Sequence, residues 1–134
     1  MPNSDGEVCG EGYYLAYNTY AQNNVGIESP EKLIEMLYEG ILRFNVQAIR
    51  AINDNNIEKR TYWINRSMAI FVELIQTLDM KEGDIALYLN GLYNHQLQML
   101  MQANINSDID SIDKVNNVVK GLLEAWRETT RVDA

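Results

Sequence analysis

Polar breaks divide the chain into four stretches in which apolar residues recur every three or four positions, the spacing of one helix face. The first stretch runs from Ser29 to Asn53. Ser29 can accept a hydrogen bond at a helix start, Pro30 suits the first helical position, and Glu31 favours the positive end of the helix dipole. A helix is therefore predicted to begin here.

Two apolar lines run along this predicted helix. The first line contains Leu33, Leu37, Ile41, Phe44, Ala48 and Ile52. The second line contains Ile34, Tyr38, Leu42, Val46 and Ile49. Because a surface helix usually needs one apolar stripe to face its core, the second line predicts a further packing partner.

The remaining three stretches predict helices of similar length. One spans about residues 57–78 after a cap at Asn56, with a seam through Ile57, Thr61, Ile64, Met68, Phe71, Ile75 and Leu78. The next is capped by Asp84 and reaches about Ala103. Its predicted inward face is Ile85, Leu89, Leu92, Met99 and Ala103, and its second line is Ala86, Leu89, Tyr93, Leu97 and Leu100. The last is capped by Ser107 or Asp108, ends near Thr130 and carries Ile112, Val115, Val119, Leu122 and Trp126.

Four helices joined by short loops predict an all-α fold, an antiparallel up-and-down four-helix bundle over residues 29–130. Residues 13–28 contain Tyr13, Tyr14, Tyr17 and Tyr20 and are expected to form a short helical or extended arm that docks on an apolar surface. Residues 1–12 are rich in glycine and acidic side chains, so a flexible extension is expected there.

Composition narrows the class of protein. The chain has 134 residues, which predicts one domain, and a net charge of −8, which argues against binding to nucleic acid or to anionic lipid headgroups. No apolar run approaches the roughly 20 residues of a membrane span, and no secretory signal precedes the bundle. With a single cysteine, the expectation is a cytoplasmic protein without membrane insertion or an internal disulfide.

Candidate catalytic groups are sparse. Glu35 and Glu39 share a helix face, but such spacing is typical of a solvated acidic strip. His95 lacks the Glu-x-x-His pairing of a di-iron bundle, and Cys9 has no neighbouring base. No glycine-rich phosphate loop is present in the sequence. We therefore predict no catalytic residue, no metal, no cofactor and no enzymatic activity.

The surplus apolar surface leaves two interpretations open with similar weight. In the first, residues 30–53 form the most buried helix, with both lines packed on neighbouring helices. Alternatively the second lines bind a partner. Tyr38, Tyr88 and Tyr93 suit interfaces and core rims alike, because each combines a large apolar area with a hydroxyl that needs a hydrogen bond.

One motif resembles the flagellar secretion chaperone family FliS. It comprises Ser29-Pro30-Glu31-Lys32-Leu33-Ile34 and Met36-Leu37-Tyr38-Glu39-Gly40, preceded by Tyr20 and Val25. Supporting matches are Asp79, Leu92-Tyr93, Ala103-Asn104 and Leu122-Leu123-Glu124-Ala125-Trp126. The resemblance covers about residues 17–128.

The resemblance implies a chaperone, not an enzyme, whose monomer binds the disordered C-terminal segment of one flagellin and prevents premature polymerisation in the cytosol. It also implies delivery to the cytoplasmic domain of the export gate of the flagellar type III secretion apparatus. In that family the N-terminal arm can occupy part of the binding surface.

The second apolar lines supply the residues predicted to bind this partner. They are Tyr17, Tyr20, Ile34, Tyr38, Leu42, Val46, Leu89, Tyr93, Leu97 and Leu100. The alternative hypothesis is a homodimeric helical interaction or regulatory module that buries the same lines and has no export client.

Overall fold

The computed structural model describes residues 29–133, which form four long helices and one short 3₁₀ turn. The elements are α2 (Pro30–Asn53), α3 (Ile57–Gln76), η2 (Met80–Glu82), α4 (Asp84–Asn106) and α5 (Ile109–Asp133). The predicted all-α four-helix bundle is confirmed. The expected extension at 1–12 and arm at 13–28 lie outside the described residues.

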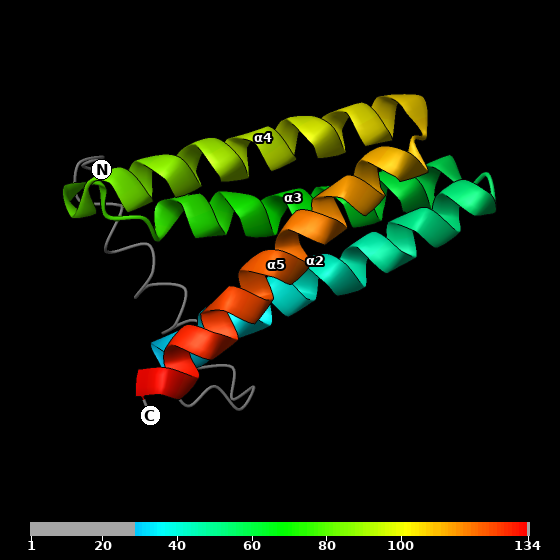
Figure 1. The fold of residues 1–134 in the computed structure, drawn as a ribbon. Coiled ribbons are helices and arrows are strands. Elements are labelled where there is room, and N and C mark those ends of the chain that lie inside the picture. The colour runs from blue at the N-terminus through cyan, green and yellow to red at the C-terminus, as the bar shows by residue number, and fades with distance from the viewer. Residues whose placement is uncertain (1–28, 134) are drawn as a thin grey trace, which may run out of the picture.

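Each helix packs against two others, so the four form a closed ring. Helix α2 contacts α3 and α5, and α4 contacts the same two helices from the other side. Figure 1 shows that the α3/α4 pair and the α2/α5 pair meet near the α4–α5 turn and diverge toward the opposite end of the bundle.

The helix starts largely follow the predicted capping residues. The Ser29 hydroxyl accepts a hydrogen bond from the Lys32 backbone N–H at 3.2 Å, and the Asn56 side chain accepts one from Lys59 at 3.0 Å. Asp108 accepts the backbone N–H of Asp110 at 3.0 Å before α5. These contacts satisfy donors that have no partner inside the helix.

The cap predicted for α4 at Asp84 is wrong. Gly83 occupies the capping position with a φ of +78°, a conformation that favours glycine, and Asp84 is already the first helical residue. The preceding η2 turn is capped instead by Asp79, whose carboxylate accepts the Lys81 backbone N–H at 3.0 Å. In the sequence, Gly83 lies between Asp79 and Asp84. Because the residues before Gly83 form a 3₁₀ turn, Asp79 caps that turn and Gly83 takes the capping position of α4.

The core consists of one apolar cluster shared by all four helices. Its completely buried side chains include Leu33, Ile41, Ile64, Phe71, Leu100, Ile112, Val115 and Val119. The first line of α2 and most of the α3 seam therefore face inward as predicted, whereas Ile57 at the start of the seam is exposed.

The inward face predicted for α4 is correct at Ala103, which is completely buried, but wrong at Ile85. Ile85 is exposed, and the buried residues of this helix are Ala86, Tyr93, Gln96, Leu100 and Ala103. Both lines on α4 are apolar, so periodicity alone could not rank them. Gln96 is tolerated in the interior because its side-chain amide donates to the Leu92 carbonyl at 3.1 Å.

Polar side chains join α2 to α5. Arg127 of α5 forms ion pairs with Glu35 and Glu39, at 2.9 Å from Glu35, so these glutamates are not the simple solvated strip expected from their spacing. The Asn45 side-chain amide donates to Asn116 at 2.8 Å in the interior. These contacts hold α5 along the side of α2 that faces away from α3.

Replacing Phe71 with alanine is expected to destabilise the bundle by about 3–5 kcal/mol, because it empties a completely buried site at the centre of the core. Urea unfolding at equilibrium measures this change. Val72→Ala is the matched control; Val72 is 46% exposed and its truncation should alter the free energy of unfolding by about 0.5 kcal/mol at most. Equal effects of the two substitutions would contradict the assigned core.

Glu35→Gln should weaken the dependence of stability on pH. The hydrogen bond from Arg127 lowers the pKa of the Glu35 carboxyl below its ordinary value of about 4.3. The ion pair therefore contributes stability above that ordinary value, and the contribution is lost as the pH falls through the lower pKa of the folded protein. Urea midpoints compared between neutral and acidic solution should differ less in the variant than in the parent.

The matched control for this substitution is Glu124→Gln, because Glu124 is exposed on α5 and makes no ion pair among the described residues. The difference between its urea midpoints in neutral and acidic solution should match that of the parent protein. An identical acid dependence in the Glu35 and Glu124 variants would contradict a stabilising role for the Arg127 pair.

Candidate binding surface

The residues predicted to bind a partner divide by burial. Those in the interior are Ile34, Tyr38, Tyr93 and Leu100. Those at least partly accessible are Leu42, Val46, Leu89 and Leu97. Tyr17 and Tyr20 lie outside the described residues. Direct contact of any of these side chains with a partner remains a prediction.

Two of the buried residues meet across the bundle. The hydroxyl groups of Tyr38 on α2 and Tyr93 on α4 lie 2.7 Å apart and hydrogen-bond to each other. The Tyr93 ring also packs beside Phe71, with ring centroids 6.1 Å apart. Burial raises the pKa of both tyrosines, so both stay neutral. In this structure the pair is a core contact that fixes the spacing between α2 and α4.

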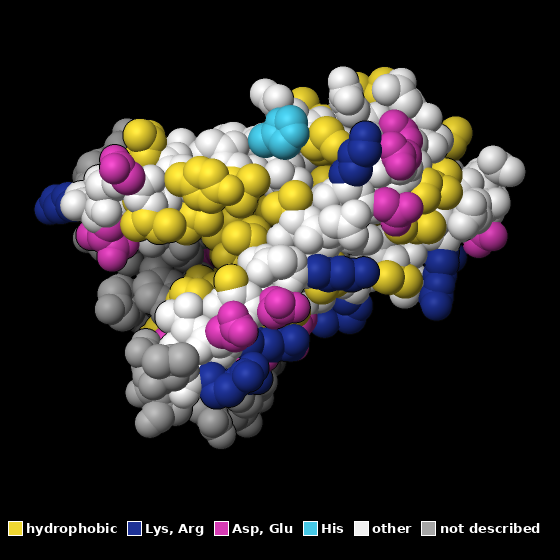
Figure 2. Space-filling view, in the orientation of Figure 1, with side chains coloured by type: hydrophobic (Ala, Val, Ile, Leu, Met, Phe, Trp, Pro, Cys, Tyr) yellow, Lys and Arg dark blue, Asp and Glu magenta, His cyan; other side chains and the backbone are white. Residues whose placement is uncertain are grey.

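Several accessible apolar side chains lie close together at the start of α4. Ile85 is 60% exposed and Tyr88 is 64% exposed, and Leu89 and Leu92 beside them are half-buried. Spacings of three, four and seven residues place these four side chains on one side of the helix. We call this set, Ile85, Tyr88, Leu89 and Leu92, the α4 apolar face. Figure 2 shows hydrophobic side chains gathered over this half of α4 and extending toward α5.

Helix α5 continues the apolar surface. Arg127 points toward α2, and Leu122 and Val118 lie on the opposite flank of α5, which faces α4. Both are half-buried. Helices α4 and α5 pack against each other, and the apolar side chains in Figure 2 continue from α4 toward α5. An amphipathic segment could bury its own apolar side chains here.

The accessible side chains at the start of α4 are mainly apolar. Among residues 29–133 no three metal-binding side chains come together. None of the helices in this part of the chain is long and apolar enough to cross a membrane. A contiguous apolar surface rimmed by polar residues is typical of a site for another polypeptide.

The sequence predicts only one member of the α4 apolar face, Leu89, as a partner-binding residue. Ile85 and Leu92 belong to the line that was predicted to face inward, and Tyr88 was noted only as an amphipathic aromatic residue. The sequence feature that pointed to an accessible apolar face was the presence of two apolar lines on one helix. Only the packing of α4 on its neighbours shows which of the two lines is left accessible.

The described residues define a helical bundle with an accessible apolar surface on α4. Comparison with known proteins is more specific. Residues 13–133 match the family described as Flagellar protein FliS, and the chain belongs to this family. The resemblance inferred from the motif at Ser29 is thereby confirmed.

Relatives from distant bacteria support the assignment. The chain is similar to the flagellar secretion chaperone FliS of Campylobacter jejuni, with 59% identity over 115 residues that cover 85% of this chain and 90% of that protein. It is also similar to the proteins of the same name from Bacillus subtilis, at 30% identity over 84% of each chain, and Escherichia coli, at 27% identity over 87% of this chain and 91% of that protein. The family is one of chaperones, which confirms the prediction that the chain is not an enzyme.

The tyrosine pair generates a double-mutant test. Tyr38→Phe or Tyr93→Phe alone leaves one buried hydroxyl without its partner and should cost about 1–3 kcal/mol. The double substitution removes both hydroxyls from the same site and should cost clearly less than the sum. Urea unfolding of the four proteins measures the coupling, with Tyr88→Phe at an exposed site as a control. Strictly additive losses would contradict the paired geometry.

Proposed function

We propose that this chain is a cytoplasmic export chaperone for flagellin. It binds the disordered C-terminal segment of flagellin, prevents its premature polymerisation and aids its delivery to the flagellar type III secretion apparatus, including the cytoplasmic domain of the export gate. The family membership and the names of the relatives support the export role. The identity of the client segment follows from the family resemblance and from the type of surface that the bundle exposes.

The single observation that carries the proposal is the accessibility of the α4 apolar face. A polymerisation-prone segment must be held through its apolar side chains, and Ile85 and Tyr88 offer such contacts without unfolding the bundle. Burying a large aliphatic or aromatic side chain contributes about 1.5–3 kcal/mol. Ordering a disordered client costs about 2–5 kcal/mol or more, so several such contacts are needed together.

The residues predicted earlier enter this proposal in two roles. Leu89 belongs to the α4 apolar face, and the accessible side chains Leu42, Val46 and Leu97 are proposed as further contacts for a client that wraps around the bundle. The buried residues Ile34, Tyr38, Tyr93 and Leu100 support the surface from within. Tyr17 and Tyr20 are proposed to form the arm that competes for this surface.

Calorimetric titration with a peptide that covers the C-terminal segment of flagellin tests the proposal. We expect one peptide per monomer and a large negative change in heat capacity, the signature of apolar burial. The double substitution Ile85→Asp and Tyr88→Asp should weaken binding by at least about tenfold, because it places two charges in the apolar contact.

The matched control is Leu87→Asp. Leu87 is 61% exposed, as accessible as Ile85, but lies on the side of α4 away from the apolar face. Its substitution should leave the affinity within about twofold of the parent. Equal losses in the two variants, or unchanged binding in the double variant, would contradict the site. No binding by the parent, with a dimer in sedimentation, would favour the homodimeric module.

A further inference from the structure

A second groove lies between α2 and α3. Its volume is about 310 Å³, and it is lined by Leu33, Met36, Leu37, Gly40, Arg43, Phe44, Arg66, Ala69, Ile70 and Glu73. We call it the α2/α3 groove. In the ring of helices the α2/α3 contact is opposite the α4/α5 contact, so this groove and the α4 apolar face are on opposite sides of the bundle.

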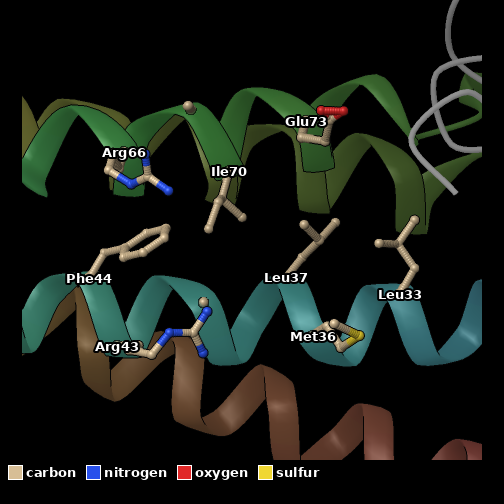
Figure 3. Close-up of a pocket in the computed structure, with 10 residues that line it drawn as sticks. Leu33, Met36, Leu37, Arg43, Phe44, Arg66, Ile70 and Glu73 are labelled. Atoms are coloured by element: carbon tan, nitrogen blue, oxygen red, sulfur yellow. The ribbon is translucent and has the colours of Figure 1, made fainter. Parts of the chain in front are cut away.

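The floor of the groove is apolar. Helices α2 and α3 approach closely in its middle, where a Cβ atom added at Gly40 would lie 3.0 Å from the Ile70 Cδ1 atom and 3.7 Å from an Arg43 guanidinium nitrogen. Gly40 is therefore already covered by these two side chains. Figure 3 shows Ile70 pointing from α3 toward α2, with Leu37 beside it on α2. The partly exposed side chains Met36 and Ile70 are the apolar surface that the groove offers to a ligand.

One end of the groove carries two arginines held by aromatic rings. The Arg66 guanidinium lies 4.8 Å from the centroid of Phe44, 5.5 Å from Tyr62 and 5.9 Å from Trp63. The Arg43 guanidinium lies 5.4 Å from the Phe44 centroid. Stacking on rings restricts where a guanidinium can point. One Arg66 N–H group donates to the Tyr62 hydroxyl at 3.3 Å, and its other N–H groups remain available to a carboxylate.

Neither arginine is neutralised within the described part of the chain. The ion pairs found there involve Lys32, Lys114 and Arg127, whereas Arg43 and Arg66 form none. The chain as a whole carries a net charge of −8, so acidic side chains are in excess. Two adjacent guanidinium groups without a carboxylate in such a chain form a site that is complementary to an acidic ligand.

The opposite end of the groove has the opposite charge. Glu73 follows Arg66 by two helical turns, or about 10 Å, on the same side of α3. Partial burial raises the pKa of its carboxyl, and it has no ion-pair partner among the described residues. The groove is thus polarised, with positive charge near Phe44, an apolar floor and a carboxylate toward Leu33 (Figure 3).

We propose that the α2/α3 groove docks an amphipathic segment of a second protein, one that presents an acidic side chain to Arg43 and Arg66 and packs an apolar side chain against Met36 and Ile70. A basic side chain of the same segment would lie near Glu73. This interaction is separate from flagellin binding and does not depend on it, because the two surfaces lie on opposite sides of the bundle.

The test uses the full-length chain and short random peptides displayed on phage. Peptides selected on the parent protein are counter-selected on the double variant Arg43→Glu and Arg66→Glu. The survivors should share an acidic residue next to Leu, Ile, Phe or Met. Synthetic copies should bind the double variant at least about tenfold more weakly than the parent, because two attractive charges become repulsive.

The matched control is Arg50→Glu with Lys120→Glu, which makes the same change in net charge at exposed positions outside the groove. The synthetic peptides should bind this control within about twofold of the parent. They should also bind a complex already saturated with the flagellin peptide. Ala69→Tyr provides a second variant that fills the groove and leaves the arginines in place, so the proposal is tested even where charge reversal impairs folding.

Four results would overturn the proposal. Selection could yield no peptides that distinguish the parent from the double variant. The double variant could lose affinity for the flagellin peptide, which would assign the groove to the client. It could abolish a dimer seen in sedimentation, which would assign the groove to a second copy. Finally, a synthetic peptide of residues 1–28 could bind the parent and fail to bind the double variant, which would assign the groove to the chain's own N-terminal segment.

Discussion

The burial of α2 on both of its flanks is the constraint on which the rest of the bundle depends. This helix packs against α3 on one flank and α5 on the other, and Tyr38 reaches across the centre to Tyr93 of α4. Most side chains of its two apolar lines are buried or partly buried in these contacts. Accessible apolar side chains remain on α4. The first turns of this helix lie where the helix pairs diverge, and Ile85 and Tyr88 there are exposed.

Much of the fold could be predicted because its determinants are local. Ser29, Asn56 and Asp108 cap helices through hydrogen bonds to residues at most three positions away, so their roles can be read from short stretches of sequence. Apolar spacing then gave the helices and the bundle. The capping residue of α4 was less predictable. A 3₁₀ turn capped by Asp79 precedes the helix, and Gly83, with a positive φ, takes the capping position in place of Asp84.

The candidate site was less predictable because it depends on which helices pack against each other in the folded protein. On α4 both lines are apolar, and the line with Tyr93 became the buried one through contacts with Phe71 and Tyr38 that are distant in sequence. The same limit applies to Glu35, whose partner Arg127 lies on the last helix. Periodicity indicates that a helix has surplus apolar surface, but tertiary packing determines which side of the helix remains accessible.

The two proposed binding surfaces lie on opposite sides of the bundle and need not influence each other. Helix α3 is the element between them: Ile70 lines the α2/α3 groove, and the next residue, Phe71, packs in the core beside Tyr93 of α4. A ligand couples two sites only when it favours one of two arrangements of the intervening structure. Phe71 and Tyr93 lie in a closely packed layer in which the Tyr93 hydroxyl is already satisfied by Tyr38. Filling either surface requires no change in that layer, so a client on one side and a second protein on the other would bind with little coupling.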